Sequence, residues 1–300
     1  MTIAAPTIAP TPPPRIEEVL RLLLSRLEPA DRDAQVSLLL AASRAAGDFD
    51  GLFEARRQGR TVGAVLAQLQ PGRAATVWMP RLVPGEPAAT ALRLLDSANA
   101  FLARSGISMA HVLLERPDPH DEALLAEAGF LRLAELRYLA ALEVDFPAAA
   151  PGSELEYLEV GDQVPLASVL EATYEATLDC PELNGARPIE DVLAGYAATG
   201  ASGRRWWRLV RHGGNMVGCL LVADHPHQEA CELVYMGLVP GARGRGWGRR
   251  LARYAQWLTR RAGRRQLVLA VDAANHPAVA LYAAEGFSAW ERRWAYWRTY

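Results

Sequence analysis

Residues 231–250 read CELVYMGLVPGARGRGWGRR and contain three kinds of segment in succession. Leu233–Val239 is an apolar run typical of a strand, Pro240-Gly241 interrupts it, and helical spacing of apolar side chains begins at Trp247. Glycines at positions 244, 246 and 248 remove Cβ atoms where a ligand must approach the backbone. The first N–H groups of a helix have no partner inside it and attract anions. The stretch therefore predicts a strand, a loop and a helix that together bind an anion.

The charges around this stretch favour the same kind of ligand. No acidic residue occurs between Glu232 and Asp272, whereas nine arginines fall in that interval. The whole chain has a net charge of −2, which argues against a general nucleic-acid binder. An arginine-rich DNA-binding face over residues 243–265 is the alternative, and it would show as strongly salt-dependent DNA binding.

Length and composition bound the class of protein. Three hundred residues suggest one large or two ordinary domains, and the absence of a run of about 18 apolar residues or a signal-peptide pattern favours a soluble cytoplasmic protein. The three cysteines, Cys180, Cys219 and Cys231, lack the spacing of a disulfide framework or a zinc ribbon. His225-Pro226-His227 has no further ligands nearby, so we expect no metal.

The chain repeats itself after a linker. Residues 1–14 are rich in Pro, Ala and Thr and predict a disordered tail, and residues 146–153 (FPAAAPGS) predict a linker. The same order of helices and strands precedes and follows that linker, including a strand at 75–83 in the first half. VWMPRLVPG at 77–85 matches VYMGLVPG at 234–241, with starting points 157 residues apart. We therefore expect two duplicated domains, at 15–145 and 154–300.

Two motifs of the second half carry a resemblance to a known family. Residues 243–248 (RGRGWG) resemble the Q/R-x-x-G-x-G/A loop of the GCN5-related N-acetyltransferase (GNAT) superfamily, which binds the pyrophosphate of acetyl-coenzyme A. Asn275, Tyr282 and Gly286-Phe287 resemble the family's N-x-x-x-x-x-x-Y-x-x-x-G-F segment. The resemblance implies an α/β (α+β) fold of two tandem GNAT-like domains, each a mixed, mostly antiparallel sheet flanked by helices. The tandem arrangement also resembles that of mycothiol synthase, which acetylates the amine of a sugar-linked cysteine.

The resemblance implies roles for individual residues, with acetyl-CoA as co-substrate and no metal. Tyr282 would give a proton to the departing thiolate, and Glu232 would act as general base, although a solvated carboxylate at a strand end fits Glu232 equally well. Gly237 suits a bulge where the strand separates from its neighbour, and Asn275 would bind the pantetheine or phosphate arm or cap a helix. The residues expected to contact acetyl-CoA are Met236, Gly237, Leu238, Val239, Arg243, Gly244, Arg245, Gly246, Trp247, Gly248, Arg249 and Asn275.

The first half lacks these features. Residues 85–89 (GEPAA) stand in place of the arginine–glycine loop, and Glu86 would repel a pyrophosphate. Leu125 aligns with Tyr282, and Asp118 aligns with Asn275. We therefore expect the first domain to be structural.

These features together predict an N-acetyltransferase that acts on a primary amine by direct attack in a ternary complex. A non-catalytic acyl-CoA sensor is the alternative. The acceptor would be a small molecule or a peptide, with no nucleic-acid or membrane partner, and the protein would be a monomer or a homodimer. Residues 177–183 (TLDCPEL) fall where the family places its acceptor helices, and their two acids, Asp179 and Glu182, suit either an ammonium group or a capped turn.

Overall fold

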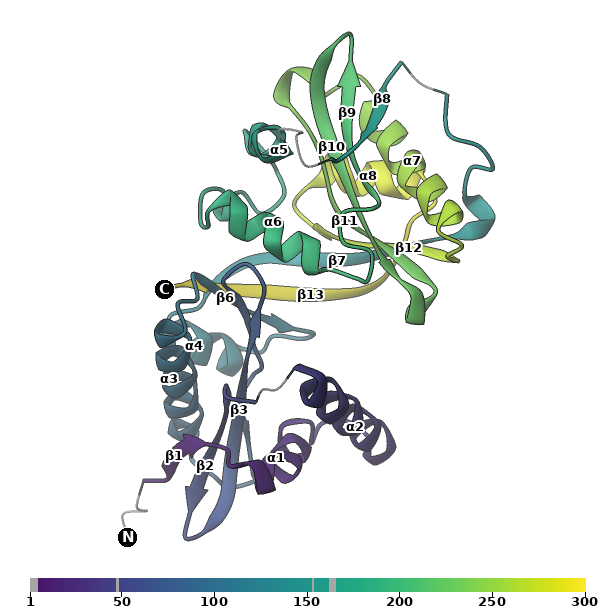
Figure 1. Cartoon of the computed structure of the whole chain (residues 1–300). Helices are drawn as coiled ribbons and strands as arrows, with labels where there is room; N and C mark the ends of the chain where they lie inside the picture. The colour runs from purple at the N-terminus through teal and green to yellow at the C-terminus, as the bar shows by residue number, and fades with distance from the viewer. Residues whose placement is uncertain (1–4, 47–48, 153, 162–165) are drawn as a thin grey trace. The chain divides into compact units, whose positions relative to one another are not determined.

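The protein is described from a computed structural model, which covers residues 5–46, 49–152, 154–161 and 166–300 (Figure 1). Its internal contacts divide the chain into two compact units. Unit 1 contains Met1–Arg132 and Tyr296–Tyr300, and unit 2 contains Leu133–Ala295. Each unit contains its own series of strands and helices.

Unit 1 is built on a mostly antiparallel sheet. Its strands follow the order β1-β2-β3-β4-β6, with β4 and β6 parallel and the other neighbours antiparallel. The elements are β1 (Thr7–Pro10), α1 (Ile16–Leu23), α2 (Pro29–Ala46), β2 (Leu52–Arg57), β3 (Arg60–Gln70), β4 (Ala74–Val77), β5 (Arg81–Leu82), α3 (Ala89–Arg104), β6 (Met109–Leu114) and α4 (Pro119–Glu127).

Unit 2 repeats the plan, with strand order β13-β7-β12-β11-β10-β9-β8. Strand β10 shows how both faces are filled, because Leu220 and Val222 pack with α7 while Cys219 and Leu221 pack with α5. The elements are β7 (Leu131–Leu142), β8 (Glu156–Glu159), α5 (Leu166–Tyr174), α6 (Ile189–Ala198), β9 (Trp207–His212), β10 (Asn215–His225), β11 (Ala230–Leu238), α7 (Trp247–Arg261), β12 (Gln266–Asp272), α8 (His276–Ala284) and β13 (Ser288–Thr299).

The predicted α/β fold in tandem copies is confirmed by this repeated order. Helix α4 begins at Pro119 and α8 at His276, 157 residues apart, which is also the spacing of the repeated sequence motifs. The final strand of each repeat does not stay with its own copy. Strand β7 pairs with β12 in unit 2, and the last residues of β13 belong to unit 1. The contacts therefore divide the chain after Arg132, upstream of the predicted linker at 146–153.

Two predictions about local structure were wrong. Residues 5–14 are not disordered, because Thr7–Pro10 forms β1, which pairs with β2; residues 1–4 lie outside the described part. The strand predicted at 75–83 breaks after Val77, since Pro80 cannot donate to a sheet ladder, and β5 pairs with β3 separately.

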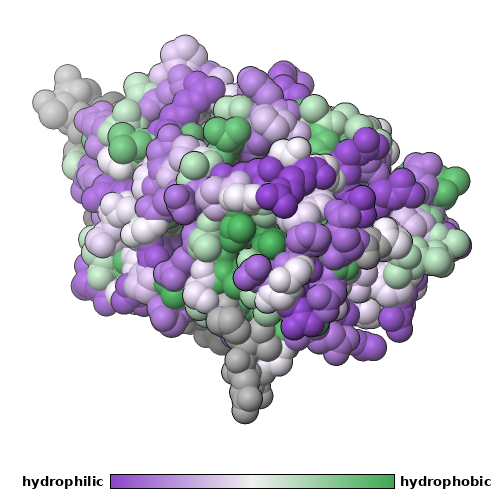
Figure 2. Space-filling model, turned by 90° about the horizontal axis from the view of Figure 1, so that it is seen from above, coloured by the Kyte–Doolittle hydropathy of each residue, from purple (hydrophilic) through white to green (hydrophobic). Residues whose placement is uncertain are grey.

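Hydrophilic side chains predominate on the face shown in Figure 2, with hydrophobic ones in small groups between them. Among the described helices, none is long and apolar enough to span a bilayer. All three cysteines are free and buried, as predicted, and burial raises the pKa of the Cys219 thiol to about 12.

Candidate active site

A cleft opens in unit 2 where two parallel strands separate. Within the described residues, β11 pairs with β12 only over Ala230–Glu232, while β11 continues along β10 to Leu238. The resulting cleft has a volume of about 460 Å³. Its walls are the end of β11, the start of α7, the end of β12, helix α8 and the segment after α5. The predicted residues that line it are Met236, Gly237, Leu238, Arg243, Gly244, Gly246, Trp247, Gly248, Arg249, Asn275 and Tyr282.

The bulge in β11 was predicted at Gly237, but the structure has it at Val234. Leu221 pairs with Tyr235 and Val222 with Leu233, so Val234 is the extra residue. Gly237 is in regular register, and its lack of a side chain has another cause. A Cβ there would lie 2.7 Å from Thr173, so α5 can approach β11 only because residue 237 is glycine.

The loop before α7 leaves room for a ligand. Gly244 and Gly246 have φ values of +75° and +74°, a conformation that other residues adopt only with strain, and an added Cβ at either would meet nothing within 4 Å. No side chain of the described residues caps α7, and its first turn has no acidic residue. The first N–H groups of the helix are therefore available to an anion.

Arg243 lines the cleft, but its guanidinium group is committed to the protein. Nε donates to Leu238 O at 3.0 Å, Nη1 to Ala176 O at 2.9 Å, and Nη2 to Thr173 O and Glu175 O. Four of its five N–H donors are therefore used, three to hold the C-terminal end of α5 and one to hold the end of β11. The side chain positions the cleft wall, which the loop motif alone did not predict.

Two predicted contact residues do not line the cleft, and a third lines it in an ion pair. The Val239 N–H donates to Val217 O at 3.0 Å, so it is not available to a ligand. The Arg245 guanidinium lies over the Trp247 ring, 5.1 Å from its centroid. Arg249 lines the cleft and is paired with the buried Glu285 at 2.5 Å.

Tyr282 is suited to donate a proton. Its side chain projects from α8 into the cleft, is only 7% exposed, and packs edge-on against Phe287. Burial, reinforced by the charge of Asp179, raises the pKa of its phenol well above the usual value, so the hydroxyl stays protonated near neutral pH. Within the described part of the chain, the hydroxyl makes no hydrogen bond.

Asn275 acts on the protein at both ends of its amide group. Its Oδ1 accepts from the Ala278 N–H at 3.3 Å and caps α8, and its side chain also hydrogen-bonds the Asp179 carboxylate. The helix-cap alternative is therefore present in the structure. A role in binding the cofactor arm stays a prediction.

Glu232 does not line the cleft. It lies on β11 just before the strands separate, with its side chain 38% exposed, and its Oε2 is 3.0 Å from His225 Nε2. The described residues include no group of three or more metal-ligating side chains, so His225 has a carboxylate partner rather than a metal cluster.

Comparisons with known proteins agree with this geometry. The profile of the acetyltransferase (GNAT) family matches residues 170–287, which include the whole cleft. This part of the chain is a GNAT domain. A mycothiol acetyltransferase of Streptomyces bingchenggensis is 33% identical over 150 residues, 39% of this chain and 48% of that relative. The chain thus spans about half the length of that relative.

Solved structures show the same fold over nearly the whole chain. A GCN5-related N-acetyltransferase from Sphaerobacter thermophilus has a TM-score of 0.65 at 16% identity and covers 98% of this chain and 95% of its own. A tandem GNAT protein from the clavulanic acid biosynthesis pathway has a TM-score of 0.50 at 17% identity, with 98% and 97% covered. These likenesses support the tandem arrangement of the fold.

Several residues that line the GNAT domain's cleft were not predicted as contacts, among them Thr173, Tyr235 and Ala270. Tyr235 and Thr173 share a hydrogen bond of 2.8 Å at the wall, and Ala270 lies on β12 opposite β11. The face that Tyr235 occupies depends on the bulge at Val234, which the sequence did not predict. Thr173 lies on α5, far away in sequence, and only the packing reveals its position.

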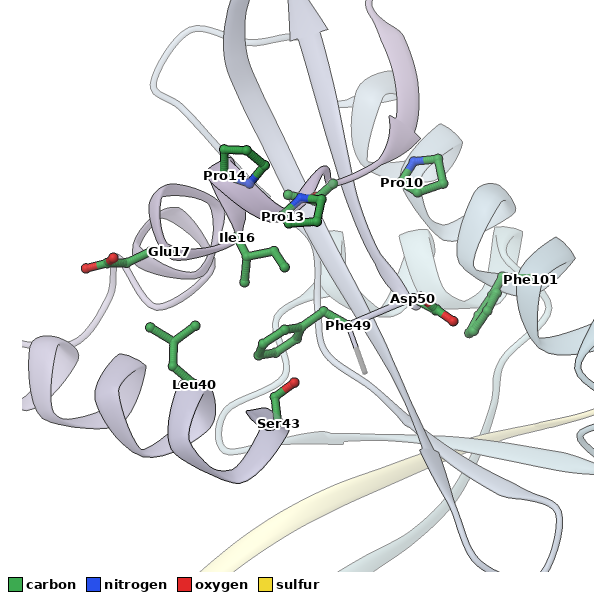
Figure 3. Close-up of a pocket in the computed structure, with 11 residues that line it drawn as sticks. Pro10, Pro13, Pro14, Ile16, Glu17, Leu40, Ser43, Phe49, Asp50 and Phe101 are labelled. Carbon is green, nitrogen blue, oxygen red and sulfur yellow. The ribbon is translucent and has the colours of Figure 1, made fainter. Parts of the chain in front are cut away.

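Another hollow, of about 770 Å³, lies in unit 1 (Figure 3). Its lining includes prolines, Phe49, Phe101 and two acids, Glu17 and Asp50. None of the described residues around it is basic, so it has no cation to offer a phosphate. This hollow therefore lacks the anion-binding features of the cleft in the GNAT domain.

Proposed function

We propose that this protein transfers an acetyl group from acetyl-CoA to a primary amine by direct attack in a ternary complex. The observation that carries the proposal is a single cleft that holds an open glycine loop, an uncapped helix start and a buried neutral tyrosine. The first two suit a pyrophosphate and the third suits a leaving thiolate. The first unit would be a structural partner.

The proposed reaction assigns each step to residues of the cleft. The pyrophosphate of acetyl-CoA lies against the N–H groups that follow Gly246, and the thioester lies between β11 and β12. The amine nitrogen attacks the thioester carbonyl, so a C–N bond forms and the C–S bond breaks. The Tyr282 hydroxyl gives its proton to the thiolate and regains one from the acylated nitrogen. The products are an amide and free CoA.

The relatives suggest which acceptor to test first. The matched relative is a mycothiol acetyltransferase, so the amine of a sugar-linked cysteine is the narrowest candidate within the primary-amine class. A peptide amine remains a prediction, and so does Glu232 as general base. Glu232, in hydrogen-bond contact with His225, offers a carboxylate but does not line the cleft.

Calorimetry with acetyl-CoA followed by a thiol-release assay over a panel of primary amines tests the proposal. Because all three cysteines are buried, a thiol reagent reports mainly the CoA that is released. We expect one acetyl-CoA site per chain and amine-dependent release of CoA. Binding without release from any amine would favour the acyl-CoA sensor, and no binding would overturn the proposal.

A further inference from the structure

Asp179 is held rigidly in the cleft of the GNAT domain, five residues beyond the end of α5. Its Oδ1 accepts a hydrogen bond from the Asp272 N–H at 3.0 Å, and its carboxylate is also hydrogen-bonded by the Asn275 side chain. Its own N–H donates to Thr177 Oγ1 at 3.1 Å. A carboxylate has about four acceptor positions, so these two bonds leave room for a ligand.

Arg243 and Arg249 line the same cleft as Asp179, but Arg243 is bound to carbonyl groups and Arg249 to Glu285, so among the described residues neither forms an ion pair with Asp179. The titratable groups that face it are Cys180 beside it, Asp272 on β12, Tyr235 on β11 and Tyr282 on α8. Among the described residues, no arginine or histidine forms an ion pair with it. A cleft carboxylate without such an ion pair attracts a cation from solution.

Asp179 is also able to hold a proton. Its accessible surface makes it an exposed residue, yet the protein atoms near its carboxyl group displace part of the surrounding water, and this desolvation raises the pKa of the carboxyl above the usual value. The negative charge of Asp272 acts in the same direction, while the hydrogen bonds from the Asp272 N–H and Asn275 oppose it.

We propose that Asp179 binds the acceptor as an ammonium ion and accepts the proton that the amine loses before attack. This inference rests on the proposed acetyltransferase function. The proton moves from R–NH3+ to the carboxylate, leaving R–NH2 and a neutral carboxyl group, which then releases the proton to water through the cleft. The nitrogen lone pair so exposed forms the C–N bond as the C–S bond breaks.

Other acids of the domain are placed less well for this role. Glu232 is paired with His225 and does not line the cleft. Glu182 lies in the short turn Pro181–Leu183, three residues beyond Asp179, and also does not line the cleft. The alternative is that Asp179 has a structural role only and holds the turn against β12. In that case the cleft should have no preference for a charged ligand.

Two synthetic CoA thioethers separate these cases without knowledge of the natural acceptor. One carries a short aminoalkyl arm on sulfur, and the other carries an alkyl arm of equal length. Calorimetry on the full chain at pH 7.5 would compare their affinities in wild type, Asp179→Asn and Glu182→Gln. We expect wild type and E182Q to bind the aminoalkyl thioether about 10-fold more tightly than the alkyl one, and D179N to bind both equally.

Each outcome has one meaning. If neither thioether binds wild type, the proposed acetyl-CoA site itself fails. If wild type binds both equally, or D179N keeps the preference, the assignment of Asp179 is overturned while the CoA site stands. Retained affinity of D179N for the alkyl thioether shows that the variant is folded. A measurement without mutation adds a check, because the wild-type preference should fall as pH drops through the raised pKa of Asp179, while the aliphatic ammonium group stays charged.

Discussion

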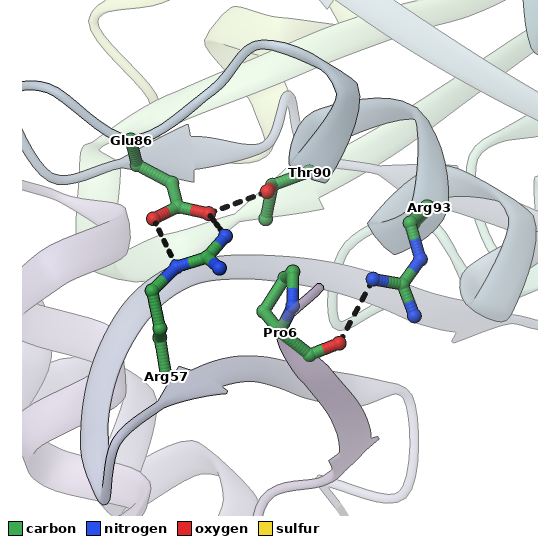
Figure 4. A network of polar contacts seen from close by, with 5 residues as sticks. All are labelled: Pro6, Arg57, Glu86, Thr90 and Arg93. Atoms are coloured by element: carbon green, nitrogen blue, oxygen red, sulfur yellow. Dashed lines mark hydrogen bonds and ion pairs between the residues drawn. The ribbon is translucent and has the colours of Figure 1, made fainter. Parts of the chain in front are cut away.

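The protein contains the same strand–loop–helix segment twice, and the two copies treat the start of the helix in opposite ways. In unit 2, the loop before α7 has two glycines at positive φ with empty space beside them. In unit 1, Glu86 lies before α3 and its carboxylate is held by Arg57 at 2.7 Å and by Thr90 Oγ1 at 2.6 Å (Figure 4). The Glu86 side chain is only 4% exposed.

This difference shows how a duplicated anion site can be lost without loss of the fold. Unit 1 supplies its own carboxylate before the helix, and Arg57 on β2 neutralises that charge. Nearby, Arg93 of α3 donates to Pro6 O at 2.8 Å, so this arginine is also bound within the unit (Figure 4). Arg57 and Arg93 of unit 1 are thus bound within the protein, whereas the loop of unit 2 is left open.

The largest expected effect concerns the position where unit 1 has Leu125 and unit 2 has Tyr282. Tyr282→Phe removes the proposed proton donor, and we expect turnover to fall by about 100-fold or more with acetyl-CoA affinity unchanged. Steady-state kinetics and calorimetry measure the two quantities. Tyr296→Phe, at a buried tyrosine of unit 1 that donates to Glu122 at 2.6 Å, is the matched control and should keep full turnover. Equal loss in both variants would contradict a chemical role for Tyr282.

The next effect uses two glycines with the same backbone strain. Gly246 has φ +74° and Gly85 has φ +84°, and neither has an atom within 4 Å of an added Cβ. Alanine at either should cost about 1 kcal/mol of unfolding free energy, because positive φ is strained for L residues. Only Gly246→Ala should weaken acetyl-CoA binding, by about 10-fold or more, since its Cβ enters the proposed pyrophosphate site. An equal loss of binding in Gly85→Ala would mean that acetyl-CoA binds to unit 1, and would contradict the proposed site in unit 2.

A smaller effect, on stability alone, is expected from Glu86→Gln. Arg57 is the main cause of the lowered pKa of Glu86, so the folded state favours the carboxylate. The stability that this contributes is present above the unfolded pKa of about 4.3 and is lost as pH falls through the lower folded value. We expect the variant to have a Tm a few degrees lower at pH 7 and no difference from wild type at sufficiently low pH. A constant difference in Tm at every pH would contradict the ion-pair explanation.

Much of the fold could be predicted because it depends on local pattern. Helix α7 begins at Trp247 as predicted, and the apolar side chains that follow with helical spacing, such as Leu251 and Leu258, are buried. The short strands β1 and β8 were missed, since four residues of mixed polarity carry little periodicity. The exchange of the last strands was also missed, because the choice of neighbour for β7 depends on an edge of β12 more than a hundred residues away.

The site, like the fold, could be predicted where it depends on local sequence pattern and not where it depends on contacts between distant residues. The glycine loop and Tyr282 carry their chemistry in local spacing, and the structure brings both to one cleft. Three of the guanidinium bonds of Arg243 reach carbonyl groups 67 to 70 residues away in sequence, and Gly237 is small because Thr173 of helix α5 lies against it. Such contacts leave no trace in the spacing of the loop itself.

The smallest expected effect asks whether the loop binds by its backbone or by its exposed arginines. Arg245 lies over Trp247 at 5.1 Å before the N-terminal end of α7, and Arg261 lies over Trp257 at the same distance at the C-terminal end. The two alanine variants change charge and ring contact equally. We expect Arg245→Ala to weaken acetyl-CoA binding only about 2- to 3-fold, with the loss disappearing at high salt, and Arg261→Ala to change nothing. A loss of 30-fold or more in Arg245→Ala would mean that its side chain contacts the phosphate directly. The absence of an arginine from the loop of unit 1, rather than the closing of that loop by Glu86, would then explain why unit 1 has no anion site.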